Sequence, residues 1–247
     1  MKIAVLSDIH GNIWALEAVF QDIQKRNVDH LINLGDIFYG PLEPRLTYER
    51  LKKIPVVTIL GNQDRVMIEA RKYQSQANAT LAYGMDNLGE EPLNWLTGFP
   101  TTTHFQEEFL LCHGAPHNDT VYLLEDISQG FAWVKEEEII LNELSGVAAS
   151  IILCGHSHTP RVVRLSNGVL IINPGSVGLP AYNDDSPHFH IMQTCSPFAS
   201  YALLEKQGTE WSVEEIKVAY DFSSAVKCAE DHGRLDWAGW LYNGRAD

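Results

Sequence analysis

The sequence is poor in cysteine, in positive charge and in long apolar runs, and each shortage excludes a class of protein. Its 247 residues include only 4 cysteines, none in CxxC spacing, which argues against a zinc–thiolate site and a disulfide scaffold. With 18 Lys and Arg against 32 Asp and Glu, the formal net charge is −14, so stable binding to nucleic acid or to an anionic membrane is disfavoured. No apolar run approaches the length of a membrane span, and the stretch after Lys2 is too short for a signal peptide. We therefore expect a reduced, cytoplasmic protein without membrane or nucleic-acid partners.

The first strand of the chain ends in two chemically active side chains. Residues 3–6 form a short apolar run, which predicts a buried strand over residues 2–6, and Asp8 and His10 come shortly after it. In an extended segment, residues two apart point to the same side. A carboxylate and an imidazole are therefore expected to project together from the carboxyl end of this strand, where open α/β sheets bind their ligands.

The next elements predict a strand–helix–strand unit. Apolar residues at spacings of three and four across residues 12–26 indicate one helical face, with Asn12 as its N-cap. Residues 30–34 then predict a second buried strand, which ends in Gly35-Asp36. Because a βαβ unit is right-handed and its strands are parallel, we expect Asp36 beside Asp8 at one sheet edge.

The remaining pattern predicts an α/β fold in a single domain spanning residues 1–247. We expect a helical insertion at about residues 65–100, near the site, and C-terminal helices at about 222–242. Cys112 and Cys154 lie in apolar runs and are expected in the core. Further strands are expected at 56–60, 101–106, 107–111, 151–153, 161–165, 169–172, 189–192, 201–205 and 211–218, and helices at about 46–53, 65–85, 91–96, 127–144 and 223–242.

Five of these strands end in the same few residue types. Carboxylate and amide oxygens are hard ligands, and imidazole suits Zn, Fe, Mn or Ni. Seven donors are too many for one ordinary divalent ion, but they suffice for two ions that share a bridging carboxylate. The candidate donors are Asp8, His10, Asp36, Asn62, His113, His156 and His158.

Together, the motifs DxH, GD, GNxD, HG and GHSH resemble those of the calcineurin-like metallophosphoesterases, over residues 3 to about 180. The resemblance implies a four-layer αββα sandwich of two mixed β-sheets flanked by helices, with a binuclear metal centre at the strand ends. It also implies the ligand roles. Asp8, His10 and His158 would bind the first metal, Asn62, His113 and His156 the second, and Asp36 would bridge both.

The resemblance further implies hydrolysis of phosphoesters by a hydroxide that bridges two divalent cations. Two such ions roughly 3.5–4 Å apart lower the pKa of a shared water and neutralise phosphoryl oxygens. We expect Mn²⁺ first, with Fe, Zn or Ni as alternatives. Ser7 and Ser157 are expected to be hydrogen-bonding loop residues, because this reaction needs no protein nucleophile.

Two departures from the family pattern bear on the substrate. Many relatives carry a His, the usual candidate for general acid, where this chain has Gln63, and the Asp that pairs with it in GDxxDRG is also missing. The motifs around Tyr39 and in residues 113–116 and 173–178 instead resemble the bacterial and archaeal phosphodiesterase branch. Without a general acid, we expect esters with good leaving groups. At Ala181, related sequences often have an Arg that could reach a substrate phosphate.

The sequence therefore favours hydrolysis of phosphodiesters or nucleotide phosphoanhydrides, with a broad-specificity phosphomonoesterase as the alternative. A non-catalytic scaffold of the same fold is the alternative from another class, disfavoured because all seven ligand positions are filled. His188 and His190 are interpreted as a solvated or core pair. Trp237 and Trp240 are expected to pack the C-terminal helix onto the sheet, or else to form a contact in a homo-oligomer.

Overall fold

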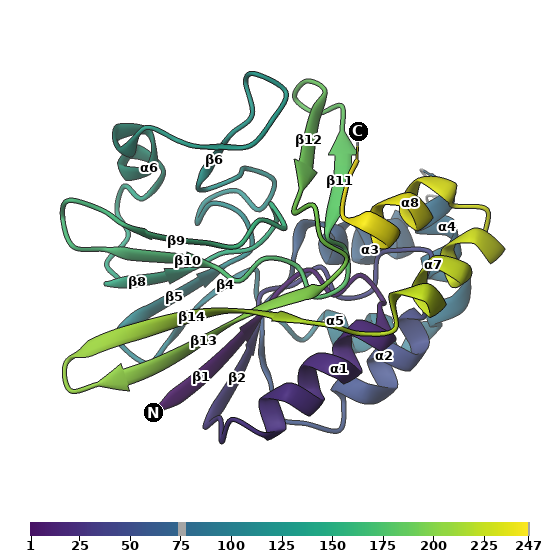
Figure 1. Cartoon of the computed structure of the whole chain (residues 1–247), viewed down its shortest axis with the longest axis horizontal. Coiled ribbons are helices and arrows are strands. Elements are labelled where there is room, and N and C mark those ends of the chain that lie inside the picture. The colour runs from purple at the N-terminus through teal and green to yellow at the C-terminus, as the bar shows by residue number, and fades with distance from the viewer. Residues whose placement is uncertain (74–77, 247) are drawn as a thin grey trace.

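Two five-stranded mixed sheets form the centre of the molecule (Figure 1). The computed structural model describes residues 1–73 and 78–246. In the first sheet, β1, β2 and β3 are parallel, and β13 pairs antiparallel with both β1 and β14. Its strand order is β14-β13-β1-β2-β3, with β1 at Lys2–Leu6, β2 at His30–Asn33, β3 at Val57–Thr58, β13 at Ala199–Gln207 and β14 at Glu210–Val218.

The second sheet has a similar plan, with three parallel strands at its centre. The strands β5, β8 and β10 are parallel, and the antiparallel strands β4 and β9 form the two edges. The strands β9 and β10 form a hairpin whose turn contains Asn167-Gly168. The order is β4-β5-β8-β10-β9, with β4 at Thr102–Phe105, β5 at Phe109–Cys112, β8 at Ile151–Leu153, β9 at Arg161–Arg164 and β10 at Leu170–Asn173.

Alternation along β1 explains how the two sheets and the helices pack. Ile3 and Val5 lie in the core between the sheets, with Phe109 and Leu111 of β5. Ala4 and Leu6 point the other way, into the core beneath the helices. A strand that buries both faces needs a continuous apolar run, which is the pattern of residues 3–6.

Helices cover both outer faces, so the predicted sandwich is confirmed, but they do so unequally (Figure 1). The second sheet is covered by one short helix, α6 (Glu137–Glu143), whose Ile140 packs with the buried Cys112 and Cys154. The other helices belong to the first sheet or lie near the strand ends: α1 (Ile13–Gln24), α2 (Pro44–Leu51), α3 (Asn62–Tyr73), α4 (Ala79–Leu88), α5 (Glu90–Leu96), α7 (Phe222–Asp231) and α8 (Leu235–Asn243).

The prediction of one long helix over residues 127–144 is wrong. Gly130 has a φ of +82° and closes a turn in which its N–H donates to the Ile127 carbonyl, so the chain reverses there. The turn joins a short antiparallel pair, β6 (Glu125–Asp126) and β7 (Trp133–Val134), and only α6 is helical. The apolar spacing of the segment is therefore not that of one helix.

Two other helix predictions need correction, and one hairpin was missed. The helix predicted over 65–85 is two helices, α3 and α4, with residues 74–77 outside the described residues and Asn78 as the N-cap of α4. The C-terminal helix is also two, α7 and α8, separated at Gly233, where φ is +72°. The strand predicted at 189–192 is β12 (His190–Gln193), and it pairs with the unpredicted β11 (Ala181–Asp184). Within the described residues, no helix is long and apolar enough to cross a membrane.

Candidate metal centre

The loops after β1 and β2 are tied together at the carboxyl edge of the first sheet. The backbone N–H of Asp8 donates to the Gly35 carbonyl, and that of His10 donates to the Asp36 carbonyl, both at 3.0 Å. These bonds hold Asp8, His10 and Asp36 next to one another, and all three residues are buried. The convergence predicted from the βαβ unit is confirmed.

Five of the seven predicted donors have left-handed backbone conformations. Such φ values are uncommon in residues other than glycine, and a strained backbone costs about 1–3 kcal/mol for each residue. Strain persists only where the surrounding structure over-determines it, and it gathers at functional sites. The residues and their φ values are Asp8 (55°), His10 (51°), Asp36 (53°), His156 (69°) and His158 (57°).

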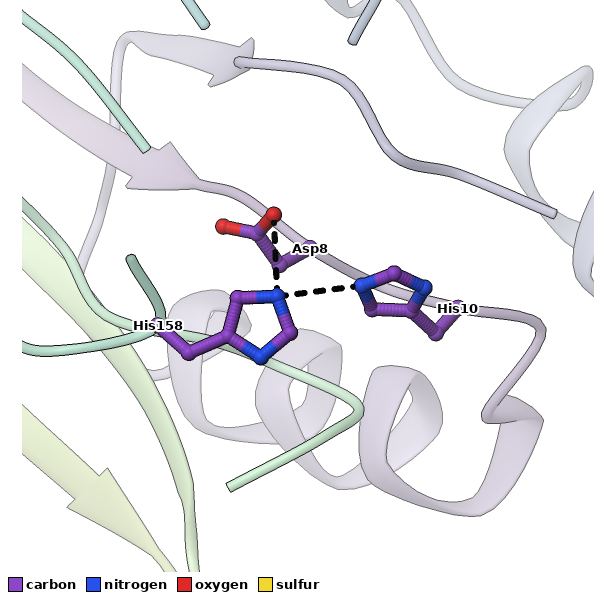
Figure 2. A group of neighbouring side chains, drawn as sticks. All are labelled: Asp8, His10 and His158. Atoms are coloured by element: carbon purple, nitrogen blue, oxygen red, sulfur yellow. Dashed lines mark hydrogen bonds and ion pairs between the residues drawn. The ribbon is translucent and has the colours of Figure 1, made fainter. Parts of the chain in front are cut away.

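Six of the predicted donors form two adjacent groups, each with its ligand atoms within 4.8 Å of one another. The first group is Asp8, His10 and His158 (Figure 2), in which His158 Nε2 lies 3.3 Å from Asp8 Oδ1 and 3.1 Å from His10 Nε2. The second group is Asp36, His113 and His156. His113 Nε2 lies 3.4 Å from Asp36 Oδ2 and 3.8 Å from Asp8 Oδ1, so the two groups are neighbours.

Backbone carbonyls set the protonation of three of the histidines. A carbonyl oxygen can only accept a hydrogen bond, so the ring nitrogen facing it carries the proton and the other nitrogen presents a lone pair. In the neutral imidazole, each of these Nε2 atoms therefore presents its lone pair to the site, as metal ligation requires. The bonds are His10 Nδ1 to Tyr39 (2.7 Å), His113 Nδ1 to Leu34 (2.8 Å) and His158 Nδ1 to Leu179 (2.7 Å).

His156 is oriented the opposite way. Its Nε2 donates to the Thr120 carbonyl at 3.2 Å, which leaves Nδ1 as its free donor atom. The ring of Tyr122 stacks on it with centroids 4.5 Å apart and an angle of 22°. This imidazole is thus fixed by one hydrogen bond and one aromatic face.

Several buried acceptors at the site have no hydrogen-bond partner among the described residues. They include Asp8 Oδ1, Asn62 Oδ1 and His113 Nε2. A buried polar atom without a partner costs about 1–3 kcal/mol. In addition, His10 Nε2 and His158 Nε2 lie 3.1 Å apart, a contact that needs either a shared proton or a bound cation between the two nitrogens. The donors present therefore fit divalent cations.

The local pKa values show negative charge on the carboxylates of the donor groups and positive charge on His113. Burial disfavours a charged His113, but the Asp36 carboxylate outweighs burial and raises the pKa of His113 to about 10. Burial, together with the neighbouring His158, lowers the pKa of His10 to about 4. Burial opposes ionisation of Asp8 as well, yet His158 and His113 hold its pKa below the usual range. The carboxylates are therefore ionised and the site attracts cations.

Asp64 is a positioning residue. It is the last residue of the motif GNxD, and no role was predicted for it from the sequence. Its carboxylate accepts backbone N–H bonds from Asp36 (2.8 Å), Ile37 (2.9 Å) and Gly61 (3.0 Å). Burial and the Asp36 charge raise the pKa of Asp64 to about 7. Its contacts fasten the loop after β3 to the loop after β2, and so set Asn62 relative to Asp36. The sequence signal for Asp64 was its position, two residues after the predicted ligand Asn62.

A cavity of about 220 Å³ opens over the donors. Gln63 lies in its wall, as does Thr80 from the region expected to be near the site. The prediction that Trp237 and Trp240 pack the C-terminal helix onto the sheet is confirmed for Trp240, which packs α8 on β11. Trp237 is buried beside Leu42 and Leu179 instead, and its ring also meets the His10 ring edge-on at 5.7 Å and lines the cavity. The sequence reasoning also missed Arg234 as a residue of this wall, because nothing in the helical spacing shows where α8 docks.

The remaining candidates lie in ordinary surroundings. Ser157 Oγ accepts a hydrogen bond from Asn173 Nδ2 at 3.0 Å, as expected for a loop residue, whereas Ser7 Oγ is buried with no partner among the described residues. His190 Nε2 is 2.9 Å from the Tyr122 hydroxyl, and His188 Nε2 donates to the Ile127 carbonyl at 2.7 Å. Neither His188 nor His190 belongs to the two donor groups.

The two-sheet fold with buried oxygen and nitrogen donors at its strand ends defines the architecture of a metal-dependent enzyme. A family model, described as the calcineurin-like phosphoesterase superfamily domain, matches residues 1–196. The chain belongs to the calcineurin-like phosphoesterase superfamily, and it is a metal-dependent phosphoric ester hydrolase.

Two known proteins match this chain over nearly their full length. A crystal structure of a metallophosphoesterase from Sphaerobacter thermophilus superposes with a TM-score of 0.76 and 26% identity, covering 99% of each chain. An uncharacterized protein of Methanocaldococcus jannaschii is 24% identical over 260 residues, covering 96% of this chain and 95% of that protein. Both alignments extend beyond residue 196, so they include the C-terminal helices.

Proposed function

We propose that this enzyme hydrolyses phosphodiester or nucleotide phosphoanhydride bonds with two divalent cations, of which Mn²⁺ is our first choice. Asp8, His10 and His158 would hold the first cation, and Asn62, His113 and His156 the second. Asp36, whose Oδ2 faces His113, would contact both. The observation that carries the proposal is the set of buried polar atoms without hydrogen-bond partners, among them Asp8 Oδ1, Asn62 Oδ1 and His113 Nε2, beside the close Nε2 atoms of His10 and His158.

When bound, a pair of cations supplies a water of lowered pKa and neutralises the oxygens of a phosphoryl group. The chain contributes the rest. The carbonyls of Leu34, Tyr39 and Leu179 orient three imidazoles, and the N–H of Gln63 donates to Asp36 Oδ1 at 2.9 Å, which fixes that carboxylate. The burial of Asp8 and His113 excludes bulk water from the side of the site opposite the cavity.

The cavity wall favours esters with good leaving groups. Gln63 occupies the wall where the resemblance would place an acid, and its amide does not titrate at neutral pH. A leaving group must then depart as an anion or take its proton from solvent. Aryl phosphodiesters and nucleotide anhydrides release stable anions, so they meet this requirement better than alkyl esters do.

The test is hydrolysis of a matched aryl phosphodiester and aryl phosphomonoester by metal-stripped protein, with and without added Mn²⁺. An alkyl phosphodiester serves as the poor-leaving-group comparison. We expect turnover only with metal, faster on the aryl diester than on either of the other two. Faster turnover of the monoester would favour the broad-specificity phosphomonoesterase, and equal rates on aryl and alkyl diesters would contradict the leaving-group argument.

A further inference from the structure

One wall of the cavity comes from residues beyond the family model, which ends at residue 196. Three side chains of the α8 segment lie in this wall: Arg234, immediately before the helix, and Trp237 and Trp240 within it. The helices α7, α8, α3 and α4 lie together at one end of the molecule (Figure 1). Arg234 Nη1 donates to Thr80 Oγ1 of α4, so the α8 segment is bonded to α4 at the cavity.

Arg234 is the one Lys or Arg among the described residues that line this cavity. The carboxylates and imidazoles that share the lining are Asp36, Asp184 and histidines of the two donor groups. With cations bound, the donors themselves are charge-compensated, and Arg234, which is paired with Asp236, is then the cationic side chain of the wall. An anionic ligand that enters the cavity would find this guanidinium as its charged protein partner.

The guanidinium is held in place and keeps donors to spare. Asp236 accepts from Arg234 Nε at 2.9 Å and from Nη2 at 2.6 Å, and Thr80 accepts from Nη1. The Trp237 ring centroid lies 5.7 Å from the guanidinium carbon. Arginine has five N–H donors, so these bonds leave one on each terminal nitrogen. A pre-positioned pair of N–H groups suits two oxygens of one phosphoryl group.

The packing of α8 also explains why Ala181 is small. Ala181 on β11 is fully buried and packs with Ile191, Trp240 and Ala246. A long side chain at this position would collide with α8. The packing of α8 that leaves no room for an Arg at position 181 also places Arg234 in the lining of the cavity.

We propose that Arg234 binds the phosphoryl oxygens of the substrate, so that the C-terminal helices form the substrate-binding wall of the enzyme. This inference rests on the proposed function, because it takes the cavity over the donors as the place where the phosphoester binds. The size of the cavity agrees with it. At about 220 Å³ it is smaller than the roughly 300–1,000 Å³ typical of pockets that enclose a whole drug-sized ligand. It therefore encloses a phosphoryl group and its immediate surroundings, and the rest of the substrate extends outside.

The test compares R234Q and R234K with the control K227Q. Lys227 lies on α7, its side chain is 73% exposed and it pairs with Asp231. K227Q therefore removes one positive charge from the α7–α8 pair of helices, as R234Q does, but outside this cavity. Inorganic phosphate is titrated into each Mn²⁺-loaded protein by calorimetry, and kcat and KM are measured on the aryl phosphodiester. Near-ultraviolet circular dichroism and bound Mn²⁺ check that the variants retain the fold and the metal centre.

We expect R234Q to weaken phosphate binding roughly ten- to hundredfold, as loss of hydrogen bonds to a charged group does, and to raise KM more than it lowers kcat. R234K keeps the positive charge but lacks the paired N–H donors of a guanidinium. Its phosphate affinity should therefore lie between those of R234Q and the wild type. If R234Q does not fold, the partial loss in R234K carries the test. Phosphate binding by R234Q and R234K equal to that of K227Q would overturn the proposal. Because phosphate binding is measured without turnover, a wild type that binds phosphate through Arg234 but hydrolyses nothing would count against the proposed function alone.

Discussion

Replacing Asp36 with Asn is expected to abolish metal-dependent hydrolysis and to reduce the amount of Mn²⁺ that the protein retains. The substitution preserves shape and one oxygen, but it removes the negative charge that stands 3.4 Å from His113 Nε2. Loss of a residue that only supports a metal ligand costs roughly 10–100-fold in metal affinity or activity, and loss of a direct ligand should exceed this. Metal content and kcat/KM of D36N against wild type measure the effect.

The matched control for D36N is D231N. Asp231 is an exposed residue of α7 that pairs with Lys227 and does not contact the metal-donor groups. Its replacement by Asn changes the net charge by the same amount as D36N does. We expect D231N to keep the metal and the activity of the wild type. A D36N protein that bound Mn²⁺ and hydrolysed phosphodiesters as D231N does would show that Asp36 is not a ligand.

The second large effect is expected from G61A. A Cβ built on Gly61 would overlap both Asp36 Oδ1 and the Asp36 backbone nitrogen. Neither can move freely, because the nitrogen donates to Asp64 and the oxygen accepts from Gln63. Overpacking of this kind costs about 1–3 kcal/mol and displaces the backbone. We expect a lower free energy of unfolding in urea together with loss of activity.

The control for G61A is G239A, also a Gly-to-Ala change. A Cβ on Gly239, inside α8, meets no atom within 4 Å. Alanine is favoured over glycine in a helix by about 1 kcal/mol, so G239A should be as stable as the wild type or more stable. G61A as stable and as active as G239A would mean that the close approach of the loops after β2 and β3 does not position Asp36.

The donors could be predicted from sequence because their signal is local. Each follows a short apolar run, and the parallel βαβ rule brings the ends of neighbouring strands to one edge. Asp8, His10 and Asp36 meet there, and His113, His156 and His158 join them in two groups. The local sequence pattern does not show the backbone and side-chain conformations that orient these donors. The choice of Nε2 or Nδ1 depends on carbonyls such as Leu179 and Thr120, distant in the chain, and the left-handed φ values are not visible in the residue types.

The cavity wall could not be predicted for a related reason. Trp237 and Trp240 have the spacing of an ordinary apolar helix face, and the sequence does not say which surface that face covers. In the structure α8 contacts β11, a strand that the sequence reasoning did not find, and this contact turns Arg234 toward the cavity. The failed prediction over residues 127–144 has a simpler origin, because a turn at Gly130 interrupts a segment whose composition is helical.

The central claim is that the two donor groups hold two cations that hydrolysis requires. The most direct measurement is the Mn²⁺ bound per chain, determined by elemental analysis after metal-stripped protein is reloaded and freed of excess metal, with hydrolysis of the aryl phosphodiester followed in the same samples. We predict two ions per chain in the wild type and activity that rises with their binding. Hydrolysis that is undiminished in protein free of metal, or full activity with no more than a trace of bound Mn²⁺, Fe, Zn or Ni, would contradict it.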